Sequence, residues 1–321
     1  MKVVVTGGLG FLGRSLARQI ASRGEVAGRS VDGLVLADRV APGTEPAVPD
    51  GAEAVDLDVG DRDQVTELLD RPDVAVFHLA SIVSAGGELD FDGALRVNLD
   101  GTRNVLEACR ELGSRPRIVF TSTLATFGGS RMPETVTDTL RQVPQTTYGM
   151  TKAIGELLVN DYTRKGFVDG RCARLPTVVI RPGAPNAAAS SFASAVFREP
   201  LNGVDYALPV GLDVRMPVIG ERTAVECLLR LAALDGDALG DDRALNLPSI
   251  AVAVAEMLES LRRVGRGRPL GQVRVEVDPR IEAIVRTWPT STTFDRATAL
   301  GLPCDETLDA IVEAYMADHL S

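Results

Sequence analysis

The chain has 321 residues, of which 45% are hydrophobic and 24% are charged. This composition excludes a largely disordered protein, which is poor in branched apolar side chains, and the length is typical of about two domains. The formal net charge is −10, from 44 acidic and 34 basic side chains. Nucleic-acid-binding proteins carry a basic footprint, so we expect no nucleic-acid partner.

We expect neither an export signal nor a membrane segment in this sequence. The apolar run Val3–Val5 follows Met1 and Lys2 and is too short for the apolar region of a secretory signal. No window of about 18 uncharged apolar residues occurs, so we expect no membrane span. A cytoplasmic location is therefore predicted.

Strands and helices are predicted to alternate through the first 180 residues. Apolar and β-branched runs predict strands at 2–6, 33–37, 52–57, 74–79, 118–122 and 174–180. Apolar residues at helical spacing predict helices at 11–21, 61–69, 95–112 and 148–165. The alternation predicts an α/β fold of the Rossmann type, with a doubly wound parallel sheet.

The pattern loosens after Pro182, where a loop leads into the small-residue run 187–191. Further helices are predicted at 221–234, 252–264 and 307–319. We therefore predict a first domain over 1–180 and a smaller C-terminal α/β domain over 181–321, whose segments can interleave.

Residues for metal or disulfide chemistry are few. The four cysteines have no paired spacing and are expected to be reduced core residues: Cys109, Cys172, Cys227 and Cys304. With only His78 and His319 present, a histidine-rich metal site is excluded, and we expect no metal ion. We predict that His78 is a hydrogen-bonded core histidine rather than a catalyst.

A glycine-rich turn joins the first predicted strand to the first helix. Residues 6–13, TGGLGFLG, contain the pattern G-x-x-G-x-x-G. Glycines allow a tight turn and a close approach of pyrophosphate, while the amino end of the helix supplies N–H donors and positive dipole charge. A phosphate can therefore bind here despite the net negative charge. The predicted dinucleotide contacts in this turn are Gly7, Gly10, Phe11, Leu12 and Gly13.

Asp38 ends the second predicted strand, 25 positions after Gly13 (38 − 13). A carboxylate at this point accepts hydrogen bonds from the adenosine ribose and repels the 2′-phosphate of NADP. We therefore predict NAD as the cofactor. Arg39 leaves the tolerance for NADP open, since an arginine near this point can hold a 2′-phosphate.

Tyr148 and Lys152 lie four positions apart on one face of the helix predicted at 148–165. A neighbouring cation stabilises a phenolate and lowers the pKa of the tyrosine, which can then transfer a proton near neutral pH. Upstream, Ser122 and Thr123 supply hydroxyls at the carboxyl end of a strand, where open α/β sheets bind ligands.

The glycine turn, the strand-end hydroxyls and Y-x-x-x-K, in this order, resemble the short-chain dehydrogenase/reductase superfamily, in its extended branch. This resemblance implies that Tyr148 is the catalytic acid/base and that Lys152 lowers its pKa and binds the nicotinamide ribose. The family's serine falls on Thr123, which keeps the hydroxyl, and Ser122 is the fallback. The resemblance also implies a C-terminal substrate domain and a homodimer through the helices at 95–112 and 148–165.

Further cofactor contacts follow from the same resemblance. They lie after the third and fourth strands, at the start of the long helix and in the sixth strand segment. Together with Tyr148 and Lys152, these contacts are Asp58, Val59, Leu79, Ala80, Ser81, Asn98, Pro176 and Thr177.

The segment from Arg174 to Gly183 departs from the nucleotide-sugar members of this branch, because Thr177 stands in the place of their asparagine and their Y-G-P is missing. With T-S-T-L-A-T-F-G at 121–128, the segments 181–186, 190–194 and 198–203 look like the D-erythronate dehydrogenase group. That resemblance implies NAD-dependent oxidation of the 2-hydroxyl of a four-carbon sugar acid to a 2-oxo acid.

A small hydroxy acid needs one cation for its carboxylate, and the arginine fork suits that group. Arg181, Arg198 and Arg215 are candidates among which the sequence does not choose. The remaining predicted substrate contacts are hydroxyl and amide side chains: Ser81, Thr123, Tyr148, Asn186, Ser190 and Ser191.

Two alternatives keep the same fold. An NAD-dependent epimerase or dehydratase of nucleotide sugars usually returns the cofactor to its starting state, so steady NADH accumulation excludes it. A non-catalytic nucleotide-sensing module often lacks the tyrosine or the lysine, and both are present here. The sequence leaves open the stereochemistry of the substrate and the direction of the reaction in the cell.

Overall fold

The computed structural model describes residues 1–40, 47–183 and 189–320. The chain forms two compact units. The first contains residues 1–126, 146–174 and 225–245, and the second contains 127–145, 175–224 and 246–321. The break at 174/175 lies close to the predicted boundary at 180, and the chain also crosses between the units on either side of 127–145 and of 225–245.

The first unit is built on a seven-stranded sheet with the order β13-β9-β7-β6-β1-β4-β5. Its strands are β1 (Lys2–Thr6), β4 (Gly33–Asp38), β5 (Ala52–Asp56), β6 (Val74–His78), β7 (Arg117–Thr123), β9 (Asp169–Leu175) and β13 (Ala244–Asn246). β1 pairs in parallel with both β4 and β6, so the chain reverses its direction of winding there. This order confirms the predicted doubly wound α/β fold, in which ligands bind beyond the carboxyl ends of the strands at such a reversal.

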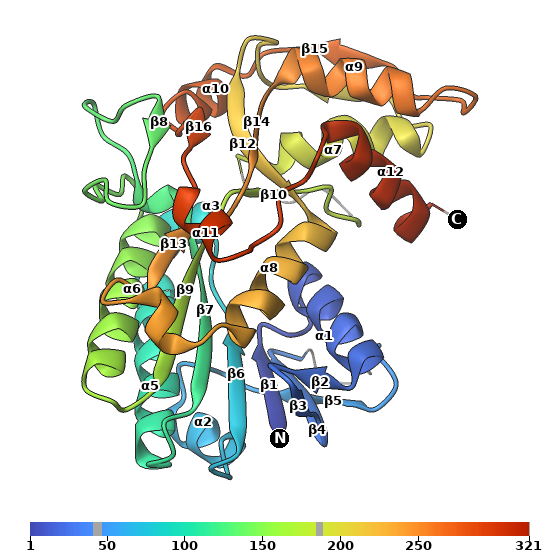
Figure 1. Cartoon of the computed structure of the whole chain (residues 1–321). Coiled ribbons are helices and arrows are strands. Elements are labelled where there is room, and N and C mark those ends of the chain that lie inside the picture. Colours follow the sequence, from blue (N-terminus) through green and yellow to red (C-terminus); the bar gives the residue numbers. More distant parts are fainter. Residues whose placement is uncertain (41–46, 184–188, 321) are drawn as a thin grey trace. The chain divides into compact units, whose positions relative to one another are not determined.

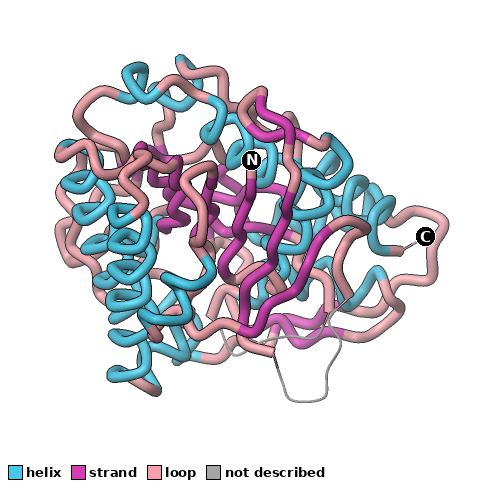
Figure 2. Tube along the Cα trace, turned by 90° about the horizontal axis from the view of Figure 1, so that it is seen from below, coloured by secondary structure: helices cyan, strands magenta, loops and turns pink. Residues whose placement is uncertain are grey.

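Helices cover both faces of this sheet (Figures 1 and 2). The helices α5 (Gly101–Glu111) and α6 (Thr147–Arg164) lie on one side and α1 (Phe11–Arg23) on the other (Figure 1). On the α5–α6 side, Val76, Ile118 and Phe120 of the strands form one buried cluster with Leu106 and Val159 of the helices. The uninterrupted apolar strands thus match a sheet that is buried on both faces.

The long helix predicted at 95–112 is not uniform. It is preceded by the short α4 (Phe91–Ala94), runs as a π-helical segment over Leu95–Asp100 and continues as α5. Helical spacing alone cannot distinguish the two hydrogen-bonding patterns. π-Helical turns inside α-helices are frequently found at functional sites.

The single strand predicted at 174–180 is wrong. Residues 169–175 form β9 in the first unit, and Thr177–Val179 form β10 in a three-stranded sheet of the second unit. Pro176 separates them, because proline lacks the N–H that would continue the ladder. In that sheet β10 pairs in parallel with β12 (Arg215–Gly220), which pairs antiparallel with β14 (Ile250–Ala253).

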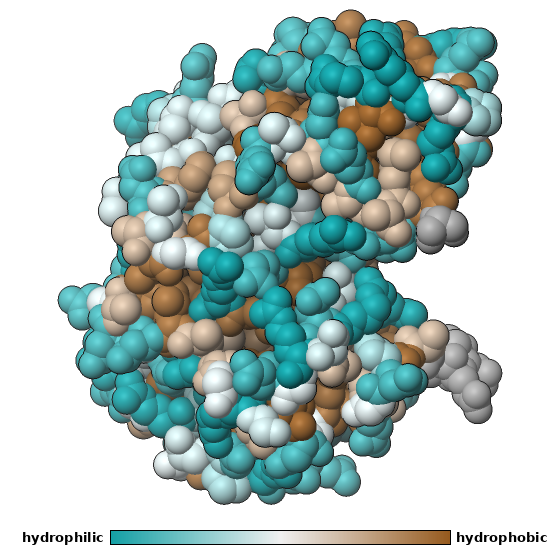
Figure 3. All heavy atoms as spheres, turned by 45° about the vertical axis from the view of Figure 1, so that its right-hand side comes forward, coloured by the Kyte–Doolittle hydropathy of each residue, from teal (hydrophilic) through white to brown (hydrophobic). Residues whose placement is uncertain are grey.

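The second unit packs α7 (Ser191–Leu201), α9 (Val254–Val264) and α12 (Leu308–His319) around a core that includes Phe192, Phe197, Met257 and Val312. The chain also forms the helix α8 (Glu221–Ala233). The remaining elements of both units are short: β2 (Glu25–Val26), β3 (Arg29–Ser30), α2 (Arg62–Leu68), α3 (Ser84–Leu89), the 3-10 helices Leu124–Thr126 and Gly236–Leu239, β8 (Thr135–Val136), β11 (Tyr206–Leu208), β15 (Val273–Val275), α10 (Pro279–Val285), β16 (Ser291–Thr292) and α11 (Asp295–Ala299). Hydrophilic side chains are spread over the face drawn in Figure 3.

Three of the four cysteines are buried as predicted, and all four are free thiols. Cys304 is exposed, which corrects its assignment to the core, because it lies in the irregular stretch between α11 and α12. None of the helices in the described ranges is both long and apolar enough to span a membrane.

Candidate active site

The glycine turn between β1 and α1 is packed too closely for side chains. Gly7 has φ +69°, and a Cβ on it would meet the backbone nitrogen of Ala80 at 2.7 Å. A Cβ on Gly13 would meet the Gly7 carbonyl oxygen at 2.4 Å. These positions therefore require glycine, and the turn brings β1, α1 and the segment after β6 together. Gly10 is the exposed residue before the helix, and its Cβ would be less crowded.

The amino end of α1 suits a phosphate. Gly10 is the N-cap and has no side chain to accept from the first N–H groups, which begin at Phe11 and Leu12. Unsatisfied N–H groups and the helix dipole together favour an anion at this place. Asp38, at the end of β4, accepts a hydrogen bond from Leu9 N at 3.0 Å, which fixes its carboxylate beside the turn. The residues present thus fit the two phosphates and the adenosine ribose of NAD.

Asp58 lies just past β5 and forms the centre of a second polar group. Although burial opposes it, hydrogen bonds from Arg96 and Gly60 N hold the pKa of Asp58 below its usual value. Arg39 also donates to this carboxylate, at 3.1 Å. Val59 is buried beneath α5, against Gly101. The Arg39 guanidinium is therefore engaged by Asp58, 19 residues away, while the Arg39 backbone N–H donates to Asp38 Oδ1 at 2.9 Å.

His78 ends β6 and is a core residue, as predicted. It is 1% exposed, with Nδ1 at 2.6 Å from the Thr6 hydroxyl and Nε2 at 3.1 Å from the Thr102 hydroxyl. Burial, with a smaller effect of the charge on Lys152, lowers the pKa of His78 to about 3. The imidazole is therefore neutral at physiological pH and bonded on both nitrogens.

Asn98 of the π-helical segment holds the loop after β6. Its Oδ1 accepts from Ser81 Oγ at 3.1 Å and from Ile82 N at 2.7 Å, and its Nδ2 donates to Ile82 O and to the Thr151 hydroxyl. Asn98 is 2% exposed. Its amide thus ties the segment of Leu79, Ala80 and Ser81 to α6.

Tyr148 and Lys152 occupy the first two turns of α6, which packs against β7. Lys152 is 3% exposed, and its Nζ donates to the Thr121 carbonyl at 2.7 Å and lies 5.9 Å from the centroid of the Tyr148 ring. Burial lowers the pKa of Lys152 to about 7, against the opposing influence of Cys172 and Glu156. The Lys152 ammonium therefore points toward the carboxyl end of β7 and lies near the ring of Tyr148.

Thr123 and Ser122, at the end of β7, have different environments. The Thr123 side chain is half-buried, and its hydroxyl accepts from Ala125 N at 3.1 Å. Ser122 is 1% exposed and donates to Glu156. Since successive side chains of a strand point to opposite faces, only one of the two can face a ligand. The buried hydroxyl of Ser122 argues against its selection as fallback catalyst and leaves Thr123.

Sequence reasoning missed the ion pair beneath Lys152. Glu156 and Arg174 are 5% and 6% exposed, and both Nε and Nη2 of Arg174 donate to the carboxylate, the latter at 2.8 Å. A signal was present, because Tyr148, Lys152 and Glu156 recur at intervals of four and must share one helix face. The arginine could not be found this way, since it comes from β9, 18 residues later.

The second unit holds the other predicted substrate contacts. Arg198 is 4% exposed and bonded to Glu199 and to the Arg181 carbonyl, and Arg215 donates to the Ala251 carbonyl. Arg181 is half-buried beyond β10. Arg198 thus serves the fold through these bonds.

Several predicted residues of this unit are placed by its secondary structure. Ser190 and Ser191 begin α7, and Thr177 begins β10 directly after Pro176. Asn186 lies outside the described residues.

Comparison with known proteins identifies the family of the chain. Residues 3–237 match the model of the NAD dependent epimerase/dehydratase family. D-erythronate dehydrogenase of Cupriavidus necator is 46% identical over 99% of this chain and 98% of its own length. D-erythronate dehydrogenase of Haemophilus influenzae is 40% identical over 98% of this chain and 99% of its own.

A solved structure, the nucleoside-diphosphate-sugar epimerase from Agrobacterium tumefaciens, is 36% identical with a TM-score of 0.90, covering 100% of this chain and 94% of the other. These matches confirm the superfamily predicted from the motifs and NAD as the cofactor. The chain belongs to the NAD-dependent epimerase/dehydratase family, as an NAD-dependent dehydrogenase of the extended short-chain dehydrogenase/reductase type.

Proposed function

We propose that the protein oxidises the 2-hydroxyl of a small sugar acid, such as D-erythronate, to the 2-oxo acid with NAD. The observation that carries the proposal is the buried Lys152 ammonium, which donates to Thr121 O one helical turn from Tyr148. In this arrangement, Tyr148 can accept the proton of a secondary alcohol while the charge of Lys152 stabilises the phenolate. The names of the two relatives at 46% and 40% identity support the substrate class.

Tyr148 acts as the base in the proposed reaction. Its phenolate accepts the proton of the substrate hydroxyl while the carbon that bears the hydroxyl loses a hydride. Lys152 stabilises the phenolate by its positive charge, and Thr123 donates a hydrogen bond to the reacting oxygen. That carbon becomes a carbonyl and Tyr148 becomes protonated, and the hydride with its negative charge would pass to the bound cofactor, so atoms and charges balance.

The predicted binding residues would hold NAD and the substrate in position for the reaction. When bound, NAD supplies the hydride acceptor. The α1 amino end would hold its phosphates and Asp38 its adenosine ribose, while Asn98 keeps Ser81 at the edge of the site through the bonds described above. In the second unit, we assign Arg181 to the substrate carboxylate, with Ser190 and Ser191 as hydroxyl partners.

Incubation of the full-length protein with NAD and a panel of tetronic and pentonic acids tests this function. Steady accumulation of absorbance at 340 nm with a four-carbon acid is expected, and nucleotide sugars are expected to give none. Absence of NADH formation with every sugar acid would overturn the proposal.

An epimerase acting on nucleotide sugars is the second candidate, favoured by the name of the 36% identical solved structure, a nucleoside-diphosphate-sugar epimerase. In that case a nucleoside-diphosphate sugar would be converted to its epimer without net NADH. The same panel, analysed by chromatography as well as by absorbance, separates the two reactions.

Asp38 is predicted to select NAD over NADP. Replacing it with alanine removes a charged acceptor of ribose hydrogen bonds, so the Kd of NAD should rise about tenfold to a hundredfold, while that of NADP should change little. Asp38→Asn is the matched variant, because it can still accept from Leu9 N. Calorimetric titration of both cofactors measures the effect, and equal losses for NAD and NADP would contradict it.

Thr123 is predicted to act through its hydroxyl. Thr123→Ala should lower kcat by about a hundredfold with a small change in KM, because the hydrogen bond strengthens in the transition state. Thr123→Ser keeps the hydroxyl and its acceptance from Ala125 N, and should retain most activity. If the serine variant were as impaired as the alanine variant, the methyl group rather than the hydroxyl would be required.

The proposal includes a homodimer through the helices at 95–112 and 148–165. Leu157 of α6 is 67% exposed, and Leu89 and Phe91 before the π-helical segment are 86% and 54% exposed. Light scattering is expected to give twice the chain mass for the protein and the chain mass for Leu157→Glu. A monomeric wild-type protein would overturn the dimer and leave the catalytic proposal intact.

A further inference from the structure

A cavity of about 240 Å³ lies in the first unit at the amino ends of the strands. Met1, Val74, Arg117 and Asp169 line it from the starts of β1, β6, β7 and β9. Tyr148 and Thr123 belong to the opposite edge of the same sheet, where the strands end. The cavity is therefore separate from the candidate active site.

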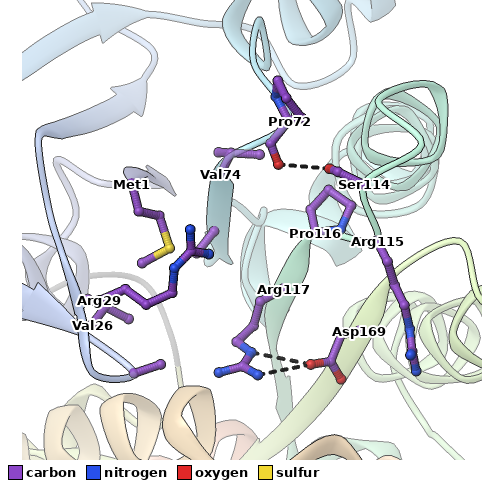
Figure 4. Close-up of a pocket in the computed structure, with 12 residues that line it drawn as sticks. Met1, Val26, Arg29, Pro72, Val74, Ser114, Arg115, Pro116, Arg117 and Asp169 are labelled. Carbon is purple, nitrogen blue, oxygen red and sulfur yellow. Dashed lines mark hydrogen bonds and ion pairs between the residues drawn. The ribbon is translucent and has the colours of Figure 1, made fainter.

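The walls of the cavity are of two kinds (Figure 4). One part is apolar, from Val26, Ala27, Val74 and Ala75 with two prolines. The other is charged: Arg29 extends inward from the β2–β3 hairpin, and Arg117 reaches from β7 to Asp169 (Figure 4).

Positive charge at the floor of the cavity exceeds negative charge. The Asp169 carboxylate lies 3.2 Å from Arg117, 3.0 Å from Arg171 and 3.9 Å from Arg243. Arg171 is completely buried, its Nε has no hydrogen-bond partner, and neither does Asp169 Oδ1. One carboxylate therefore faces three guanidinium groups in a poorly solvated place, where uncompensated charge is costly.

Charged residues at the edge of the cavity, here called the rim, add to the excess of positive charge. Arg29 pairs with Asp73, the Met1 ammonium lies 2.9 Å from Asp32 and 3.6 Å from Asp73, and Arg115 is exposed. Lining residues and their ion-pair partners together carry six positive charges and three negative charges, in a chain of net charge −10.

A structural role accounts for part of the cluster. Arg117, Arg171 and Arg243 donate at 2.6–2.7 Å to the carbonyls of Ala232, Leu234 and Gly236, at and just beyond the carboxyl end of α8. The carbonyl oxygens accept hydrogen bonds from the arginines but carry no net charge. The dipole of α8 offsets only about half a positive charge. The excess positive charge therefore remains.

We propose that this cavity binds a small organic anion, with its carboxylate or phosphate group on Arg29 and Arg117, while Arg115 adds positive charge at the rim, on the far side of Asp169 in Figure 4. A short carbon skeleton would lie against Val74 and Ala75. Guanidinium forks recognise both acidic groups by paired hydrogen bonds. The volume is below that of sites for drug-sized ligands, which limits the skeleton to a few carbons.

Titration calorimetry on the full-length protein tests the proposal with butyrate, butyl phosphate and butan-1-ol. Saturable binding of at least one of the two anions is expected, and none of the alcohol. In Arg29→Gln/Arg115→Gln the affinity should fall about tenfold or more, since one hydrogen-bonding guanidinium and one further positive charge at the rim are lost. Both side chains are exposed and lie outside the Arg117–Asp169 pair, so the fold should persist.

Arg62→Gln/Arg103→Gln is the matched control, because it removes the same charge from exposed arginines of α2 and α5. This control should bind the anion as the wild type does, and NAD-dependent turnover should be unchanged in both double variants. Failure of both anions to saturate at millimolar concentration would overturn the proposal. Equal affinity in the wild type and Arg29→Gln/Arg115→Gln would also overturn it, because the anion would then bind elsewhere, including the active site.

Discussion

Replacing Tyr148 with phenylalanine is expected to lower kcat by about 10³-fold, because the variant loses the only proton acceptor that the proposed reaction provides at the substrate hydroxyl. Phenylalanine preserves the ring beside Lys152, whose Nζ lies 5.9 Å from its centroid. The Lys152–Thr121 bond and the glycine turn are untouched. NAD binding, measured by calorimetry, should therefore be nearly unchanged while steady-state NADH formation is almost lost.

Tyr162→Phe is the matched control for this experiment. Tyr162 lies on the same helix, and its hydroxyl donates to Glu107, away from the end of β7. This variant should keep its kcat. Near-normal turnover by Tyr148→Phe would refute the assignment of the tyrosine as acid/base, whereas parallel losses in both variants would indicate damage to α6.

The nucleotide-binding half of the fold was predictable because its signals are local. Unbroken apolar runs mark strands that are buried on both faces, and the glycine pattern of the turn lies within residues 6–13, although the contact that requires Gly7 comes from Ala80. The predicted turn contacts and Asp38 accordingly lie together, as the Leu9–Asp38 hydrogen bond shows. Tyr148 and Lys152 share a helix face for the same local reason.

Contacts between distant segments could not be predicted. Glu156 and Arg174 meet across a helix and a strand, and Asp169 gathers arginines from β7, β9 and the start of β13. No periodicity links such positions. The strand predicted at 174–180 failed similarly, since hydropathy continues through Pro176 while the backbone hydrogen bonds change from one sheet to another.

Breaking the Glu156–Arg174 pair is expected to lower the free energy of unfolding by about 3–5 kcal/mol, since one member of a buried ion pair is left with an uncompensated charge. Glu156→Gln is the sharpest variant, because an amide oxygen in the place of Oε1 can still accept from Ser122 and from Arg174 Nε while the negative charge is gone. Urea unfolding followed by far-ultraviolet circular dichroism measures the change.

Two further variants separate charge from packing. Glu156→Leu/Arg174→Met replaces both charges with apolar groups and should recover most of the lost stability, because removing both members avoids an unpaired buried charge. Arg62→Gln breaks the exposed pair with Glu111 and should change the free energy of unfolding by less than about 1 kcal/mol. A loss of that small size in Glu156→Gln would mean that water reaches the pair. Since Glu156 and Lys152 lie one turn apart on α6, a dry pair would also explain how the ammonium stays fixed at Thr121 O while its own pKa is lowered by burial.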